Sequence, residues 1–266
     1  MYHFISNMLR RLWQGYRRWR LARLLRARRI PARLWCQVVE DLPLLQAYGR
    51  GDRHRLRVLA SRFLQDKLIT GVADFEPSTY MRVVIAAQAC VPILNLGLDY
   101  YQGWREIILY PDSFVVQAHW QDEFGVVHEG EEGHSGEAWA QGPILLAWDE
   151  IAPDRSAERP TYMNLVIHEF AHKLDLLNGV ADGYPPLHRE MNSHDWFEVF
   201  SNLFNKLSNE LNAGHDIQLD PYACTNPAEF FAVLSEYFFM APRLLASLYP
   251  SLYRQLTHFY QQTPAG

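Results

Sequence analysis

The chain has 266 residues, of which 48% are hydrophobic, enough to bury a sizeable core in one or two domains. Its three cysteines, Cys36, Cys90 and Cys224, are scattered and odd in number, which argues against a disulfide framework and for a reducing compartment. Because no apolar run is long enough to span a membrane, we expect a cytoplasmic protein.

The overall net charge of −5 conceals an uneven distribution. Residues 1–33 contain ten arginines and no lysine or acidic residue, which leaves a net charge of −15 on the rest of the chain. This basic arm also carries tryptophans and leucines, so it could lie as an amphipathic helix on anionic lipid or on a partner. The plainer alternative is an extension without a function of its own, or a translation start placed too early. Because the acidic body would repel phosphate, no direct binding to nucleic acid is expected.

Residues 34–105 are predicted to form a helical subdomain that packs on the rest of the protein. Residues 34–70 have apolar side chains at helical spacing, from Leu56 through Phe63 to Leu68. Residues 79–102 are also apolar and are expected to be helical, with Pro92 as a kink or a start.

Three short apolar segments are typical of strands. Ile107–Tyr110 and the three residues from Phe114 are separated by a turn at Pro111 and Asp112. A further strand is expected at residues 142–148, and its edge could pair with an extended peptide.

Residues 121–137 are acidic and contain glycine, so they predict a hairpin or a loop at the surface. The segment contains His128 and His134. These histidines could form a second metal site, although solvated loop histidines are more common.

The next element carries the motif H-E-x-x-H at residues 168–172. Two histidines four residues apart lie on one face of a helix, close enough to share a metal ion. Glu169, beside the first histidine, is suitably placed to act as a general base at the open coordination position.

The surroundings of the motif favour an amphipathic helix. The pattern extends from Thr161 to Asn178 and stops at Gly179. On a helical wheel, Val166 and Phe170 lie on an apolar face and the two histidines lie opposite them. Asp175 falls on the histidine side, where it could orient a ligand imidazole or could simply be a solvated residue at the helix end.

The C-terminal third of the chain is predicted to be helical. Residues 188–213 have a long helical pattern that ends at Gly214, with an aromatic stripe that includes Phe197 and is best explained as core. Residues 226–261 are helical again and are expected to break near Pro242 and Pro250.

A catalytic zinc site requires a third protein ligand. The continuation H-E-x-x-H-x-x-G-x-x-H is excluded, because Asp175 and Asn178 occupy the glycine and histidine positions. The best source is the helix that begins at Asn226–Pro227, which contains Glu229 and Glu236 on one face. Only one of them can reach a given ion, and spacing alone does not choose between them. A carboxylate exposed at the rim is the plainer reading, more so for Glu236.

The segments HEFAHKLD and YACTNPAEFFAVLSEYFF resemble the Mlc titration factor A family of bacterial zinc metallopeptidases. They are also similar to the catalytic domain of anthrax lethal factor. The resemblance extends from about residue 40 to the C-terminus. It implies one Zn²⁺ per chain bound by His168, His172 and Glu229, with Glu169 as general base and Tyr222 as hydrogen-bond donor to the transition state. Val233 departs from the lethal factor pattern, which has an acid there, and Glu236 could take its place.

Together these features predict a mostly helical, zincin-like α+β fold with a small mixed or antiparallel sheet beside the zinc helices. The expected domains are the arm, residues 1–33, and a metallopeptidase domain, residues 34–266. The resemblance implies an aminopeptidase-like hydrolase that acts on peptides or proteins and also binds the glucose-system repressor Mlc. The alternative is a non-catalytic protein that sequesters this repressor and retains a zinc site.

Overall fold

The computed structural model describes residues 29–112, 114–121, 127–134, 136–138, 142–153 and 162–264, without the side chains between 113 and 141. The predicted arm therefore lies almost entirely outside the described residues. Among the described residues Ile30 is the first with a buried side chain, and its backbone is held by Ser61 and Arg57 of a following helix.

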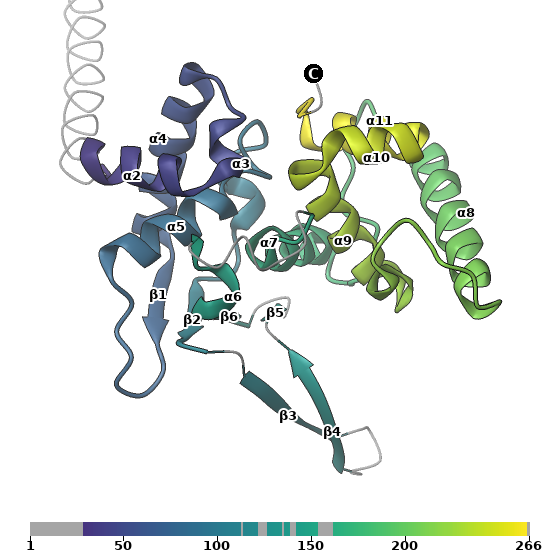
Figure 1. The fold of residues 1–266 in the computed structure, drawn as a ribbon, viewed down its shortest axis with the longest axis horizontal. Helices are drawn as coiled ribbons and strands as arrows, with labels where there is room; N and C mark the ends of the chain where they lie inside the picture. Colours follow the sequence, from purple (N-terminus) through teal and green to yellow (C-terminus); the bar gives the residue numbers. More distant parts are fainter. Residues whose placement is uncertain are drawn as a thin grey trace, which may run out of the picture.

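The N-terminal part is largely helical, as predicted (Figure 1). Its helices are α2 (Ala32–Asp41), α3 (Pro43–Gln46), α4 (Arg50–Asp66), α5 (Thr79–Ala89) and the 3-10 helix η1 (Leu98–Tyr101). The helix expected over 79–102 ends at Ala89, because Pro92 cannot continue it. The prediction was also wrong for Leu68, which belongs to a strand and is 53% exposed.

A four-stranded mixed sheet lies beside the helices, in the order β1-β2-β6-β5. Its strands are β1 (Leu68–Gly71), β2 (Glu106–Tyr110), β5 (Gly136–Ala138) and β6 (Ile144–Ala147). The first three strands in this order are parallel, and β5 runs antiparallel to β6. Because β6 is paired on both sides, the expectation that its edge is open for a peptide is wrong, and β5 forms that outer edge.

The strand expected from Phe114 is part of an antiparallel hairpin, β3 (Phe114–Gln121) with β4 (Val127–His134). Figure 1 shows this pair extending away from the remaining strands. The surface hairpin predicted for residues 121–137 is thus confirmed in its backbone, whereas the side chains of His128 and His134 lie outside the description.

The C-terminal part is helical, with the predicted breaks at Pro242 and Pro250. It consists of α6 (Trp148–Ile151), α7 (Leu165–Asp175), η3 (Leu176–Asn178), α8 (Ser193–Asn212), η4 (Pro221–Cys224), α9 (Pro227–Met240), α10 (Pro242–Leu248) and α11 (Pro250–Tyr260). Trp196, Phe200 and Leu207 of the stripe on α8 are buried as expected, but Phe197 is 59% exposed, so its assignment to the core is wrong.

One continuous apolar core runs through the described residues, from Ile30 to Tyr260. Near α7 it is rich in aromatic side chains, and Phe170 packs against Phe63, Tyr101 and Trp104. The helices therefore hold α7 rigidly from behind.

The mostly helical α+β class and the mixed sheet are confirmed, whereas the division at residues 33 and 105 stays a prediction.

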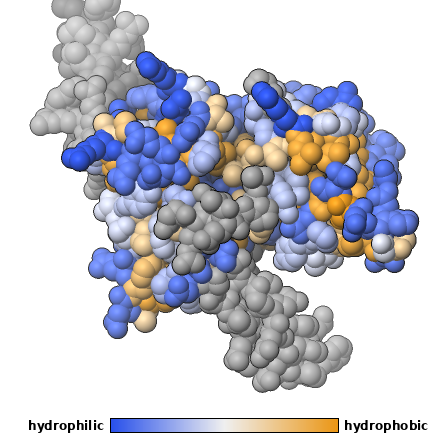
Figure 2. Space-filling view, in the orientation of Figure 1, coloured by the Kyte–Doolittle hydropathy of each residue, from blue (hydrophilic) through white to orange (hydrophobic). Residues whose placement is uncertain are grey.

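The face in Figure 2 is mostly hydrophilic, with hydrophobic side chains gathered over the C-terminal half, where Leu244 is 43% exposed. Among the described residues, no single helix is long and apolar enough to cross a membrane. Helices α9 and α10 together are long and apolar enough for a membrane span, but the chain bends by 119° between them. Most residues of α9 are buried inside the fold.

Candidate metal centre

Helix α7 presents His168 and His172 side by side. The helix begins at Asn164, whose side-chain oxygen accepts the N–H of Ile167 and caps the first turn. The opposite face is buried in the core, so the two imidazoles keep a fixed orientation. Their Nε2 atoms lie 3.2 Å apart.

Helix α9 brings Glu229 to the same point. Asn226 caps this helix by accepting the N–H of Glu229, and Pro227 occupies the first helical position. The Oε2 atom of Glu229 lies 3.0 Å from Nε2 of His168 and 3.4 Å from Nε2 of His172.

The ligand atoms of His168, His172 and Glu229 all lie within 4.8 Å of one another. Tetrahedral zinc, with bonds of about 2.0–2.1 Å, holds its ligand atoms about 3.3–3.4 Å apart, close to the three separations observed. Oε2 of Glu229 is also buried without a well-aligned hydrogen bond, as expected for an atom directed at a shared central point. The residues present therefore fit a metal ion.

Glu236 supports this cluster from the other side of His168. Its Oε1 lies 2.9 Å from Nδ1 of His168, and its Oε2 accepts the backbone N–H of Asn164. The prediction of a rim-exposed carboxylate is wrong, because Glu236 is only 6% exposed. A carboxylate on Nδ1 fixes the tautomer that leaves the Nε2 lone pair free for a metal.

The electrostatics of the cluster favour a positive charge. Burial alone would lower the pKa of His168, but the hydrogen bonds and charges of Glu229 and Glu236 raise it well above its usual value. Burial alone would raise the pKa of Glu229. The hydrogen bonds and charges of the two imidazoles have the larger effect and hold this pKa well below its usual range. A cation at this point would be stabilised by the same carboxylates.

Glu169, the predicted general base, is 3% exposed and interacts electrostatically with His168. One turn further along α7 lies Lys173, also buried, whose ammonium donates to the carbonyl of Gly142 at 3.0 Å and lies over Trp104. Burial lowers the pKa of Lys173 to about 8, while the charge of Glu169 opposes this shift. Sequence reasoning missed Lys173, because its spacing does not reveal burial.

Tyr222 lies at the open side of the cluster. Its ring centroid is 6.1 Å from that of His168, and the residue is 44% exposed. The turn of η4 is fixed by Asp220, which accepts the N–H of Tyr222. A phenol here is near the cluster and accessible to a molecule from solution.

Asp175 has a structural role. It is fully buried, so the solvated alternative is wrong, and its Oδ2 accepts the N–H of Gly183 at 2.8 Å. Gly183 in turn packs against the carbonyl of Pro227, so closely that a Cβ atom would lie 2.3 Å from that oxygen. This contact ties the loop after α7 to the first residue of α9.

Comparison with known proteins agrees with this geometry. Residues 16–261 match the family described as glucose-regulated metallo-peptidase M90. The chain belongs to this family. It is similar to proteins named Mlc titration factor A from Serratia proteamaculans (strain 568), with 40% identity over 227 residues, 84% of this chain and 85% of the relative. The protein of that name from Escherichia coli (strain K12 / DH10B) is 42% identical over 229 residues, 84% of each chain.

As a member of the M90 metallo-peptidases, the chain is expected to use a metal ion, and the described residues contain one group suited to hold it, His168, His172 and Glu229. These are the three residues that the resemblance implies as ligands, and the fold brings them together from two helices.

Proposed function

We propose that this M90 metallo-peptidase is a cytoplasmic zinc-dependent peptidase with aminopeptidase-like preference. The observation that carries the proposal is the convergence of two imidazoles and one carboxylate with a buried glutamate beside them. A set of two histidines and one glutamate is characteristic of catalytic zinc sites, which leave a position for water. A purely structural site would not need the neighbouring Glu169.

The residues around the cluster have separate tasks in this proposal. Bound zinc would supply an acidified water and polarise the scissile carbonyl. Glu169 takes the proton from the attacking water and later passes it to the leaving amine. Tyr222 donates a hydrogen bond to the oxygen on which negative charge develops, a contribution of about 2.7–4 kcal/mol in comparable sites. Glu236 holds His168 in its ligand tautomer.

The sheet offers a place for the substrate backbone. Strand β5 is the edge next to β6, and its outer side has no strand partner among the described residues. An extended peptide could add to this edge by backbone hydrogen bonds, which would fix its direction relative to α7.

The first test is Glu169→Gln. The variant should bind one zinc per chain as the wild type does, since Glu169 is not one of the three clustered ligands. Its rate of peptide hydrolysis should fall by a factor of at least about 100, the usual contribution of a general base. Zinc content by metal analysis and turnover by amine release measure the two effects. Wild-type turnover in a zinc-loaded Glu169→Gln protein would refute the role of Glu169.

The aminopeptidase-like preference rests on the resemblance and needs its own test. Matched peptides with a free or an acetylated N-terminus should differ in kcat/KM, with the free amine preferred. A chelator should abolish both rates, and zinc should restore them. Equal rates on both peptides would indicate an endopeptidase and leave the zinc mechanism intact.

A second function is suggested by the relatives, which are named for titration of Mlc. We propose that this chain also binds the repressor Mlc of its host. Purified repressor should be retained by wild type and by Glu169→Gln alike. Retention by a protein that cleaves no peptide under any condition would favour the alternative, a repressor-sequestering protein with a metal site.

A further inference from the structure

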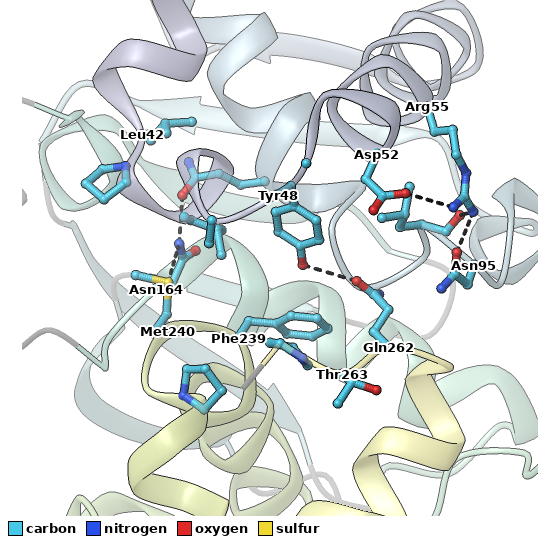
Figure 3. Close-up of a pocket in the computed structure, with 18 of the residues that line it drawn as sticks. Leu42, Tyr48, Asp52, Arg55, Asn95, Asn164, Phe239, Met240, Gln262 and Thr263 are labelled. Atoms are coloured by element: carbon cyan, nitrogen blue, oxygen red, sulfur yellow. Dashed lines mark hydrogen bonds and ion pairs between the residues drawn. The ribbon is translucent and has the colours of Figure 1, made fainter. Parts of the chain in front are cut away.

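A cavity of about 630 Å³ lies between the N-terminal helices and the end of the chain (Figure 3). Its walls come from the α2–α4 region, the start of α7, the end of α9 and residues 261–264. The four residues His168, His172, Glu229 and Tyr222 are not part of the described lining. The volume falls in the range of about 300–1,000 Å³ that is typical of small-ligand sites.

The lining combines apolar side chains with carboxamides. The apolar part includes Leu42, Leu94, Met163, Phe239 and Met240. Five carboxamide side chains also line the cavity, namely Gln88, Asn95, Asn164, Gln261 and Gln262. A carboxamide both donates and accepts hydrogen bonds, as the amide group of a peptide backbone does. Four of these carboxamides already donate a hydrogen bond within the protein, and the donors and acceptors that remain, together with the apolar walls, suit a peptide with apolar side chains.

The carboxamides are already oriented by contacts within the protein. Asn164 donates to Gln88 at 2.7 Å, and Tyr48 donates to Gln262 at 3.1 Å across the cavity (Figure 3). Little rotamer freedom is therefore left to lose when a ligand binds. At the polar end, Arg55 is paired with Asp52 at 2.9 Å, so their charges compensate and a neutral ligand is favoured over an anion.

The cavity reaches the support of the metal centre. Asn164 lines it, caps α7, and donates its backbone N–H to Glu236, which holds Nδ1 of His168. Met240, which also lines it, is the last residue of α9, the helix that carries Glu229. A ligand that contacts Asn164 and Met240 would therefore touch the start of α7 and the end of α9, the helices that carry His168, His172 and Glu229.

We propose that this cavity binds short, uncharged peptide segments with apolar side chains, and that its occupancy changes the metal affinity of the centre through Asn164 and Glu236. Peptides are the substrates of a peptidase, so the biological role of this site rests on the proposed function. The binding itself does not, because it requires no hydrolysis.

Binding is tested by calorimetry with N-acetyl-leucyl-leucine amide on metal-free protein, where the peptide has no metal to approach. The expected result is saturable binding with one site per chain, and much weaker binding of N-acetyl-seryl-serine amide. Ala47→Phe fills the cavity from an exposed position and should weaken leucine-peptide binding at least tenfold. Ala213→Phe, at an exposed position outside the lining, should leave it unchanged.

Thr263→Phe places a ring in the cavity from a different segment of the lining. It provides an independent test if Ala47→Phe does not fold. The proposal is overturned if the wild type shows no saturation up to about 10 mM peptide, or if both filled variants fold and bind as the wild type does.

The coupling is tested by measuring zinc affinity with and without the leucine peptide, in Glu169→Gln so that the peptide stays intact. A several-fold change is expected, in the range of about 5–150-fold that such couplings usually have. The same measurement in the background Ala47→Phe reports only the effect of peptide at the metal site, so the contribution of the cavity is the difference between the two backgrounds, and equal changes in both would overturn the coupling. An unchanged zinc affinity at saturating peptide would overturn the coupling, whether or not the protein proves to be a peptidase.

Discussion

His168 uses both ring nitrogens, and each faces a different carboxylate of α9. Glu229 lies on the metal side and Glu236 on the supporting side. We therefore expect Glu229→Ala to lose stoichiometric zinc. Glu236→Ala should retain it, with about 10–100-fold weaker affinity, the usual effect of removing a partner of a ligand histidine. Zinc titration against a competing chelator measures both, and tighter zinc binding by Glu229→Ala than by Glu236→Ala would reverse the assignment.

Asp175 should make stability depend on pH. Burial raises its pKa from 3.8 to about 6 in the folded protein. Between these values the folded state keeps a proton that the unfolded chain has released, so the free energy of unfolding falls as pH rises from about 4 to about 6. Asn does not titrate, so Asp175→Asn should gain about 2–3 kcal/mol relative to wild type between pH 4 and pH 7.

Urea unfolding of the metal-free proteins at the two pH values measures this difference. Asp74→Asn, a change at an exposed aspartate, serves as control and should show a difference near zero. A constant gap between Asp175→Asn and wild type at both pH values would contradict the assignment.

At the scale of elements, one glycine holds the loop after α7 against the start of α9. Gly183 has φ of +73°, and a Cβ atom there would meet the carbonyl of Pro227. Gly183→Ala should therefore lower the free energy of unfolding by about 2–4 kcal/mol, from backbone strain and overpacking together. Gly179→Ala is the matched control, since φ is +92° but the space is open, and only the backbone cost of about 1–2 kcal/mol is expected. Chemical denaturation compares them, and equal losses would exclude the contact.

Elements with local signals were predictable and those that depend on distant partners were not. Pro227, Pro242 and Pro250 begin α9, α10 and α11, as the pattern indicated. Leu68 continues a helical spacing, yet it belongs to strand β1. This strand forms because it pairs with β2, and Leu68 lies opposite Glu106, which is 38 residues later in the chain. Such a pairing leaves no mark in the local sequence.

At the scale of the whole molecule, the metal should stabilise the fold, because its ligands come from two separate helices. A zinc concentration 100 times the dissociation constant would add about 2.7 kcal/mol to the free energy of unfolding. Thermal unfolding with and without chelator should show a lower midpoint in the chelated protein. Glu229→Ala should show no such difference, and a chelator effect of equal size in that variant would place the metal elsewhere.

The three clustered residues His168, His172 and Glu229 could be named before the structure, because the motif contains two of them and the resemblance supplies the third. The support by Glu236 was predicted only as one alternative, because its contact with Nδ1 of His168 depends on how α7 packs against α9, and the backbone link through Asn164 has no signal in the sequence. The cavity could not be predicted either, because the residues that line it are far apart in the sequence, from Leu42 to Pro264.

The separation of the ligands along the chain has a consequence for biosynthesis. His168 and His172 leave the ribosome before Glu229, which follows 57 residues after His172. At about 5–20 residues per second, the two imidazoles are exposed for several seconds without their carboxylate. Helix α9 is buried against Tyr260 of α11, so it settles only when the last helix has been made. The proposed metal site would therefore be complete only late in synthesis, once α11 has followed α9.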